Sequence, residues 1–583
     1  MRQKDRQGKK LEDGLTEIQN YRLTRIKTEA ATGYFDCTPE TDWDFDTALA
    51  WSRGRPNDEF MRKHLLRRMA DWTPEELQGR LRRTDPEDLF LKALLFEACL
   101  LLAPFAPLRR LFPEKERARL APASPLIYIK SQARSDHQLH RRWVRQLRPN
   151  LEGHAPLPDP RQVGLPAPVP QAAIDRAMTV AMPLARLAAA FGPKAEAPAV
   201  RVADLEALTD LALERLAAAG ATLGAEMRHE ASLSPIALLR SWQLSHEVDC
   251  GRHHYRFAGE QISYGRGLEL AEARVACVME IVERVSSYAT IRDGRAQGYR
   301  QPHQLTHARL SELAAEGREA LDPNRLGLEA PYRDEPLYWI EGRTADAAGA
   351  RPVLVPAQAI FLFCNLDEVK LFSSWGSNGL GAGASPAQAR AKALLEAIER
   401  DCAATVPYAP ALCFDVETRD ARIARLLQSY AELGIRVGFL DITGPLGLPC
   451  CKSFVVHPDG QVAAGTGAHL DARRALMSAL TETPYPYPHG PISRPLPPAA
   501  VRVPLEALPD YDRGDARENL RLLEQLLLAN GFDPIYVDLT RADLDLPVVR
   551  ALVPGMALSS DLDRFARVHP RLYGHYLKHA QSV

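Results

Sequence analysis

The sequence predicts an α+β protein, in which an all-α amino-terminal region precedes a larger part built from strands and helices. Helix signals dominate up to about residue 235, whereas short strand-like runs alternate with helices from about residue 236 onwards. The 583 residues are 46% hydrophobic and 25% charged, which is typical of a globular protein with a full core. We therefore expect a folded chain of two to about four domain-sized units.

Composition divides the amino-terminal part. Residues 1–45 are polar and charged without clear periodicity, so we expect a poorly ordered segment. Residues 46–148 are predicted to form a helical domain, because Thr73-Pro74-Glu75-Glu76 has the N-cap, N1 proline and N3 glutamate of a helix start. Residues 149–170 are rich in proline and predict a semi-rigid linker, and a helical segment is expected over 171–235.

The composition also limits location and partners. The most membrane-like stretch, 89–108, contains Lys92, Glu97 and two prolines, so it predicts a buried helix and no membrane span. Dispersed cysteines and a polar start without a secretory signal favour a cytoplasmic protein with free thiols. A net charge of −1 gives no general attraction to nucleic acid, although the arginines of residues 109–145 leave a local basic patch open.

Apolar runs in the second part predict strands. These runs are 255–257, 360–363, 437–440, 453–456, 535–538 and 548–553.

A repeat in this second part carries most of the functional information. The first copy runs from Gly265-Arg266-Gly267 to Glu280-Ile281-Val282-Glu283-Arg284. The second runs from Ser377-Asn378-Gly379, with Gly381 and Gly383, to Glu396-Ala397-Ile398-Glu399-Arg400. A partial third copy runs from Gly465-Thr466-Gly467 to Glu482. An alanine stands seven residues before the leading glutamate every time (Ala273, Ala389, Ala475), and we interpret each copy as a glycine-led turn that enters a helix.

The repeat indicates a site with several carboxylates. Glutamates three residues apart share one helix face, so the copies can direct their carboxylates to one place. Carboxylates brought together repel each other unless cations neutralise them, and Mg²⁺ with nucleotide phosphates is the usual solution. Arg266, Arg284 and Arg400 would then suit the phosphate oxygens. For a single pair, a solvated surface charge is the commoner explanation, but recurrence at matched spacing favours phosphoryl transfer with clustered metal ions.

The three motifs, in this order, resemble those of the YcaO family over about residues 236–556, including the closing VDLTRADLDLPVVRALVPG. The resemblance implies a YcaO-type domain of antiparallel sheets packed with helices over 236–583, with ATP and Mg²⁺ as cofactors. It implies metal binding by Glu280, Glu283, Glu396, Glu399 and Glu482. It implies ATP binding by Arg266, Arg284, Ser377, Asn378, Gly379 and Arg400. No catalytic residue is assigned.

The resemblance also implies a reaction. Enzymes of this family phosphorylate a backbone amide oxygen of a peptide, which activates the carbonyl for attack by a side chain or by a sulfur donor. The products are azolines or thioamides in ribosomally made peptides, so the expected partner is a peptide or protein substrate. The alternative is an accessory factor for methylthiolation of a ribosomal protein, with a sulfur-transfer or methylthiotransferase partner protein. A nucleotide-sensing module is a third reading, and the sequence leaves homodimerisation open.

Several positions depart from the family pattern. Ala276, Ala384, Gln388 and Ser478 stand where the family usually has Ser, Asn, Glu and Arg, and no Pro-x-Pro-x-Pro tail is present. These departures suggest a divergent nucleotide site, a different metal count or weakened catalysis. They favour a thioamide-forming or accessory role over azoline formation.

Overall fold

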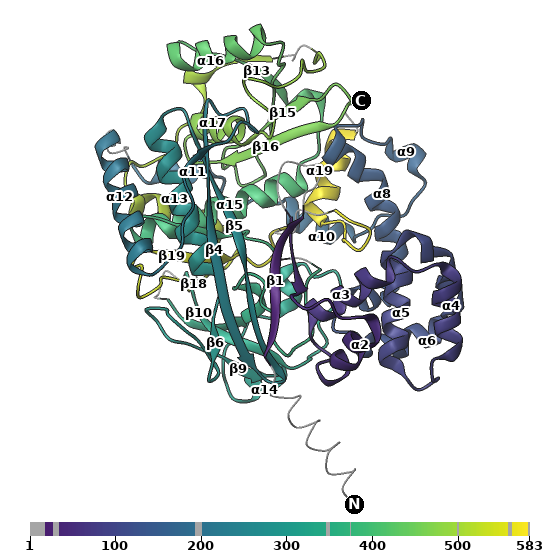
Figure 1. Cartoon of the computed structure of the whole chain (residues 1–583). Helices are drawn as coiled ribbons and strands as arrows, with labels where there is room; N and C mark the ends of the chain where they lie inside the picture. The colour runs from purple at the N-terminus through teal and green to yellow at the C-terminus, as the bar shows by residue number, and fades with distance from the viewer. Residues whose placement is uncertain are drawn as a thin grey trace, which may run out of the picture.

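The computed structural model describes residues 18–26, 34–192, 201–345, 350–373, 375–497, 501–557 and 562–580. Helices and strands are mixed in this structure, which confirms the predicted α+β class. Sheets of eight, six and five strands form the body of the molecule. The helices of residues 45–153 flank these sheets on one side (Figure 1).

The eight-stranded sheet is built on a long hairpin of β4 (Ile236–Cys250) and β5 (His253–Gly267). β1 (Gln19–Ile26) lies parallel to β5, and β2 (Tyr34–Pro39) pairs with β1 at the edge. The segment 1–45, expected to be poorly ordered, therefore contains two strands, and the first region is not all-α. Residues 1–17 and 27–33 of that segment lie outside the described residues. The short strands of this sheet are β3 (Met227–Arg228), β6 (Ile291–Arg292), β7 (Arg295–Ala296) and β8 (His303–Gln304).

The other two sheets belong to the second half of the chain. The six-stranded sheet contains β9 (Thr306–Ala308), β10 (Leu337–Thr344), β11 (Pro352–Pro356), β12 (Leu380–Ala382), β18 (Ile535–Asp538) and β19 (Val548–Leu552). The five-stranded sheet contains β13 (Cys413–Glu417), β14 (Gly438–Asp441), β15 (Cys450–Val456), β16 (Val462–Ala468) and β17 (Val501–Pro504). Neighbouring strands in the described part are antiparallel except for β1–β5, β4–β6 and β13–β17.

Five of the six predicted strands are present, within β5, β14, β15, β18 and β19. Residues 360–363 instead form a turn after a short 3₁₀ helix (Ala357–Ala359), and Phe363 has a positive φ of 50°. This turn lies in the core, where periodicity does not separate a buried turn from a buried strand.

Helices cover the faces and one side of the sheets. Those of the first region are α2 (Phe45–Gly54), α3 (Glu59–Met69), α4 (Pro74–Arg83), α5 (Leu89–Leu101), η1 (Ala103–Leu111), α6 (Glu114–Leu120), α7 (Ile127–Gln132) and α8 (His137–Gly153). Next come α9 (Pro160–Val163), α10 (Gln171–Met178), α11 (Leu184–Ala190) and α12 (Val202–Ala218). The second half contributes α13 (Leu270–Ser287), α14 (Leu310–Ala315), α15 (Pro386–Thr405), α16 (Ala421–Glu432), α17 (Ala472–Glu482), α18 (Ala516–Ala529) and α19 (Pro570–Ala580).

Local signals in the first region are well reproduced. Thr73 and Glu76 form the predicted capping box at the start of α4, with N–H to side-chain distances of 3.2 and 2.6 Å. α5 is buried as predicted, and its Glu97 is fully buried and pairs with Arg62 at 2.7 Å. No helix that the structure describes is both long and apolar enough to cross a membrane. The predicted linker differs at its start, because α8 continues to Gly153.

Candidate nucleotide and metal site

Each repeat copy is a strand that packs directly on the helix that follows it. Gly265 and Gly267 belong to β5, Gly381 to β12, and Gly465 and Gly467 to β16, so these glycines lie in strands rather than in the predicted turns. A Cβ atom added at Gly265, Gly381 or Gly467 would overlap the backbone carbonyl of Ala273, Ala389 or Ala475. The recurring alanine therefore marks the point where the helix backbone touches the strand. This contact fixes the helix, and with it the direction of its glutamates.

The first helix holds its glutamates with one arginine. The backbone N–H of Tyr264 in β5 donates to Glu280 at 2.6 Å. Arg284 contacts both carboxylates, with Nη2 at 3.4 Å from Glu280 and Nη1 at 3.4 Å from Glu283. Glu283 is buried. The strand and the arginine together hold both carboxylates in place.

The second helix repeats this arrangement. Arg400 lies with Nη2 at 3.8 Å from Glu396 and Nη1 at 3.4 Å from Glu399. The hydroxyl of Thr466, on β16 of the third copy, donates to Glu399 at 2.6 Å. The second and third copies are therefore joined by a direct hydrogen bond.

The carboxylates of the three helices face one another. Burial, followed by the charge of Glu283 on the first helix, raises the pKa of Glu396 to about 8. The surrounding protein, followed by Glu399 and then Glu280, raises the pKa of Glu482 to about 7, and Arg266 and Arg400 oppose this shift. Glu482 itself remains accessible to solvent, as a ligand for an incoming ion must be. The structure thus brings all five predicted glutamates into one electrostatic cluster.

The arginines of the cluster have hydrogen-bonding capacity to spare. Burial alone would lower the pKa of Arg400, but Glu399, Glu396 and Glu482 raise it above its ordinary value. The Nε atoms of Arg266 and Arg400 are buried and have no hydrogen-bond acceptor in the structure. Buried donors without acceptors are costly, so these nitrogens indicate an anionic ligand between the helices.

The residues fit a metal–nucleotide complex better than a bare metal ion. Within the described residues, no three carboxylate, imidazole or thiolate groups converge closely enough to hold a metal ion alone. Mg²⁺ in proteins typically takes one or two carboxylates together with substrate phosphates. The glutamates supply the carboxylates and the arginine donors suit the phosphates, so both halves of such a complex have partners here.

The predicted second nucleotide turn lies at the entrance to β12. The N–H of Leu380 donates to the carbonyl of Ser377 at 2.9 Å across Asn378 and Gly379. Gly379 has a φ of 79°, and a Cβ atom there would overlap the carbonyl of Ala551 in β19. Only glycine fits this turn. Nucleotide binding by the turn remains a prediction.

Sequence reasoning missed Arg550. It lies fully buried in β19, where burial lowers its pKa to about 9 while Glu396 and Glu283 oppose the shift. Its Nη2 donates to the carbonyl of Gly376 at 2.8 Å, but its Nε and Nη1 have no hydrogen-bond partner. An arginine in the middle of an apolar strand was the available signal. Arg550 is a third arginine on the carboxylate cluster.

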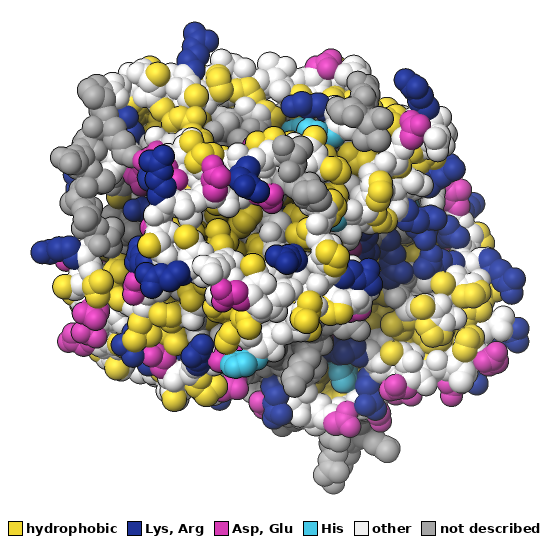
Figure 2. Space-filling view, turned by 90° about the horizontal axis from the view of Figure 1, so that it is seen from above, with side chains coloured by type: hydrophobic (Ala, Val, Ile, Leu, Met, Phe, Trp, Pro, Cys, Tyr) yellow, Lys and Arg dark blue, Asp and Glu magenta, His cyan; other side chains and the backbone are white. Residues whose placement is uncertain are grey.

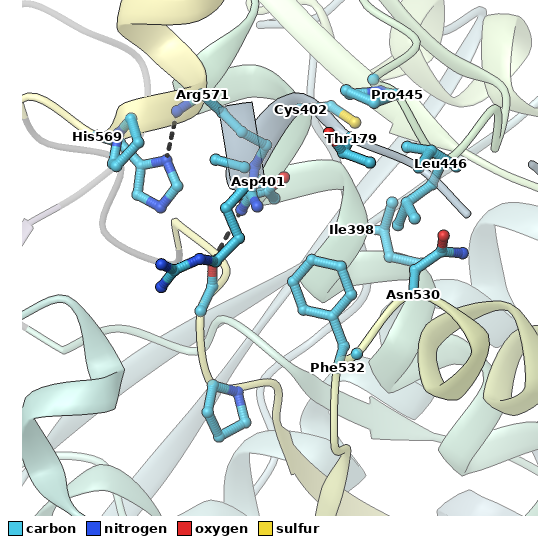
Figure 3. Close-up of a pocket in the computed structure, with 18 of the residues that line it drawn as sticks. Thr179, Ile398, Asp401, Cys402, Pro445, Leu446, Asn530, Phe532, His569 and Arg571 are labelled. Atoms are coloured by element: carbon cyan, nitrogen blue, oxygen red, sulfur yellow. Dashed lines mark hydrogen bonds and ion pairs between the residues drawn. The ribbon is translucent and has the colours of Figure 1, made fainter. Parts of the chain in front are cut away.

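A cavity of about 510 Å³ lies on the opposite face of α15 (Figure 3). Ile398, Asp401 and Cys402 of α15 line it, together with His569 and Arg571 at the start of α19. Its one carboxylate, Asp401, is already paired with Arg571 and also accepts from the N–H of Ala557 at 2.7 Å. We therefore place the metal and nucleotide site at the glutamate cluster and not in this cavity.

Comparison with known proteins agrees with this site. The model of the ATP- and Mg²⁺-binding YcaO cyclodehydratase family matches residues 264–484 and 486–557, slightly more than half of the chain. An uncharacterized protein of Methanothermobacter thermautotrophicus is 27% identical over 340 residues, which cover 52% of this chain and 84% of that protein. An uncharacterized protein in the tfuA 3′ region of Rhizobium leguminosarum bv. trifolii is 25% identical over 236 residues, which cover 37% of this chain and 53% of that protein.

Two solved structures are also similar. A heterocyclase in complex with substrate and cofactor has a TM-score of 0.46 and 19% identity, over 58% of this chain and 50% of its own. YcaO from Methanopyrus kandleri, bound with AMPPCP and Mg²⁺, has a TM-score of 0.42 and 21% identity, over 61% of this chain and 91% of its own. The chain thus spans about half the length of the Rhizobium protein and of the heterocyclase. The matched segment holds all three glutamate helices, and the chain belongs to the YcaO family, whose cofactors are ATP and Mg²⁺.

Proposed function

We propose that this protein uses ATP and Mg²⁺ to phosphorylate a backbone amide oxygen of a peptide or protein. The carbonyl carbon then accepts a sulfur or side-chain nucleophile, as in thioamide or azoline formation. The observation that carries the proposal is the convergence of carboxylates from α13, α15 and α17 around arginines whose Nε atoms lack acceptors.

Each group of residues has a defined task in this reaction. Glu280, Glu283, Glu396, Glu399 and Glu482 would hold Mg²⁺, while Arg266, Arg284 and Arg400 would donate to the phosphate oxygens. When bound, Mg²⁺ disperses the negative charge of the transferring phosphoryl group. The strand–helix contacts at the repeat alanines hold both sets of side chains in register before the substrate arrives.

The chemistry balances without a further reagent apart from the nucleophile. The γ-phosphoryl group moves to the amide oxygen and leaves ADP, which turns that oxygen into part of a good leaving group. The nucleophile forms a bond to the carbonyl carbon, and the bond from that carbon to the phosphorylated oxygen breaks with release of phosphate. An amide oxygen that is not phosphorylated leaves far more slowly, which is why ATP is consumed.

Replacing the glutamates one at a time tests the proposal. We expect Glu280→Gln, Glu399→Gln and Glu482→Gln each to lower ATP hydrolysis by about 100-fold or more, because each removes a charge that holds the metal. Glu214→Gln, on the exposed face of α12, is the matched control and should hydrolyse ATP like the wild type. Unchanged turnover in all three site variants would end the enzyme hypothesis.

The accessory role in ribosomal protein methylthiolation is the second candidate. Gln388, at a position where the family usually has a carboxylate, accepts from the N–H of Ala384 at 2.8 Å and so closes the start of α15 instead. ATP turnover that rises when a peptide is added would support the enzyme. Tight ATP binding with no turnover in the presence of any peptide would support the accessory role.

A further inference from the structure

Arginine side chains gather on the helical region, far from the glutamate cluster in the sequence. Figure 2 shows Lys and Arg side chains collected in a hollow on the right-hand side of the view, over these helices. The members come from η1, from α8 and from the segment before α19. We call this set the arginine surface: Arg109, Arg110, Arg141, Arg142, Arg145 and Arg564.

Helix capping explains two members of this surface. Arg109 donates from Nε to the carbonyl of Cys99 at 2.8 Å and from Nη2 to that of Leu100 at 3.2 Å. Arg564 donates from Nη2 to the carbonyl of Leu101 at 3.0 Å. These carbonyls end α5, where a cation is favoured by the helix dipole. The four remaining arginines have no such role.

No member forms an ion pair with any residue that the structure describes. The acidic residues nearby are already paired with other arginines: Asp136 with Arg567 at 2.6 Å, and Glu152 with Arg148 at 2.8 Å. The arginine surface therefore carries an excess of positive charge, although the whole chain has a net charge of −1.

The members repel one another. Burial, followed by the charges of Arg141 and Arg564, lowers the pKa of Arg109. Burial, followed by Arg145 and Arg564, lowers the pKa of Arg141. Like charges at such separations destabilise the folded protein unless an anion relieves the repulsion. Within this chain no described acid does so.

The observations favour a polypeptide over a nucleic acid as the source of that anion. Single-stranded nucleic acids are usually bound on exposed aromatic side chains, and no aromatic residue is among the exposed large hydrophobic residues that the structure describes. Guanidinium groups bind carboxylates in bidentate geometry, and a short acidic segment matches a compact surface.

The surface is also connected to the glutamate cluster. Arg564 lies seven residues before Arg571, which pairs with Asp401 of α15. Asp401 directly follows Arg400 of the cluster. A segment held on the arginine surface would thus lie beside the part of the chain that leads to α15.

We propose that the arginine surface docks an acidic segment of the polypeptide that the enzyme modifies. The identity of that polypeptide as the substrate rests on the proposed function, but the docking of acidic segments does not. The surface would hold the substrate by its charge, while the glutamate cluster acts on another part of the same chain.

A binding measurement without ATP tests this proposal. The probe is a fluorescently labelled peptide of eight glutamates between glycine–serine ends, followed by fluorescence anisotropy at low salt. We expect Arg141→Glu with Arg145→Glu to weaken binding by about tenfold or more, and added salt to weaken wild-type binding. The matched control, Arg425→Glu with Arg502→Glu, makes the same charge change on exposed residues of α16 and β17 and should bind like the wild type.

Further arms keep the result decisive. Arg141→Gln with Arg145→Gln should also weaken binding, which separates a lost attraction from a new repulsion or a folding defect. A peptide of eight glutamines should not bind. Equal binding of the glutamate peptide by wild type and both surface variants would overturn the proposal. Tighter binding of a single-stranded oligonucleotide, lost in the same variants, would overturn it in favour of a nucleic-acid surface. ATP hydrolysis without peptide should be unchanged in the surface variants, so a failure here differs from a failure of the proposed function.

Discussion

Glu396 is a carboxylate held where its ionised form is unfavourable. Its pKa is raised to about 8 by burial and by Glu283, from an ordinary value of 4.5. Above pH 4.5 the unfolded chain therefore loses a proton that the folded chain keeps, and the folded protein loses stability as the pH rises towards 8. The site stores this unfavourable charge for the metal ion that neutralises it.

We expect Glu396→Gln to stabilise the ligand-free protein and to abolish nucleotide binding. The gain at pH 8 should be on the order of 2 kcal/mol, and it should vanish near pH 5, where the wild-type carboxyl is protonated. Urea unfolding at both pH values measures it, and calorimetric titration with Mg²⁺ and a non-hydrolysable ATP analogue measures binding. A variant less stable than the wild type at pH 8 would contradict this account.

The five glutamates could be predicted from the sequence because their spacing and recurrence are local properties. Arg550 could not be predicted in the same way, because its role depends on the packing of β19 against α13 and α15. Thr466 is similar: it stands between the glycines of the third motif, but only the fold shows that its hydroxyl meets Glu399.

At the level of the elements, the repeat is a strand and a helix in backbone contact. We predicted turns because glycine is as frequent in turns as in strands that approach another backbone closely. The sequence alone does not say which of the two applies, since the carbonyl that excludes a Cβ atom belongs to a residue eight positions further on in the first copy. The alanine spacing was the trace of this contact.

Gly381→Ala and Gly467→Ala should therefore separate a strand from its helix. We expect each to destabilise the protein by about 1–3 kcal/mol and to weaken nucleotide binding, because the added methyl group pushes the glutamate helix away. Gly153→Ala, at the end of α8 with open space around it, is the control and should be nearly neutral in both respects. Chemical unfolding and nucleotide titration of the three variants check this. Equal effects at Gly153 and Gly467 would refute the contact model.

For the whole molecule, two sets of buried groups set the dependence of stability on pH. Burial lowers the pKa of His140, His246 and His569 to about 4 and that of His154 to about 3. Burial also raises the pKa of Glu368 and Glu482 to about 7 and that of Glu396 to about 8. The histidines make stability fall as the pH drops from about 6.5 towards 4, and the glutamates make it fall as the pH rises towards 8.

We expect the ligand-free protein to be most stable near pH 6.5. Melting temperatures at pH 5, 6.5 and 8 measure this. Mg²⁺ with ATP should raise the melting temperature most at pH 8, because the ions neutralise Glu396 and Glu482, and EDTA should remove the gain. Glu368 lies outside the cluster, so part of the loss at pH 8 should remain with the ligand bound. A ligand effect of equal size at pH 5 and pH 8 would contradict this prediction.

The α+β class and most elements of the second half followed from local patterns, but the amino-terminal strands did not. β1 has the sequence QNYRLTRI, in which the buried Tyr21 and Leu23 alternate with exposed polar residues. Two apolar side chains are too weak a signal, and the partner strand β5 begins more than two hundred residues later. A pairing of such long range is not visible in a local window.

The position of β1 beside β5 has a consequence for how the protein is made. The ribosome delivers the chain from its amino end, so β1 emerges long before the strand it needs has been synthesised. A nascent chain that stops short of His253 would carry an unsatisfied sheet edge, with Tyr21 and Leu23 open to water. Gene fragments that end between the helices and the catalytic part should thus yield aggregates or chaperone-bound material rather than a free-standing module.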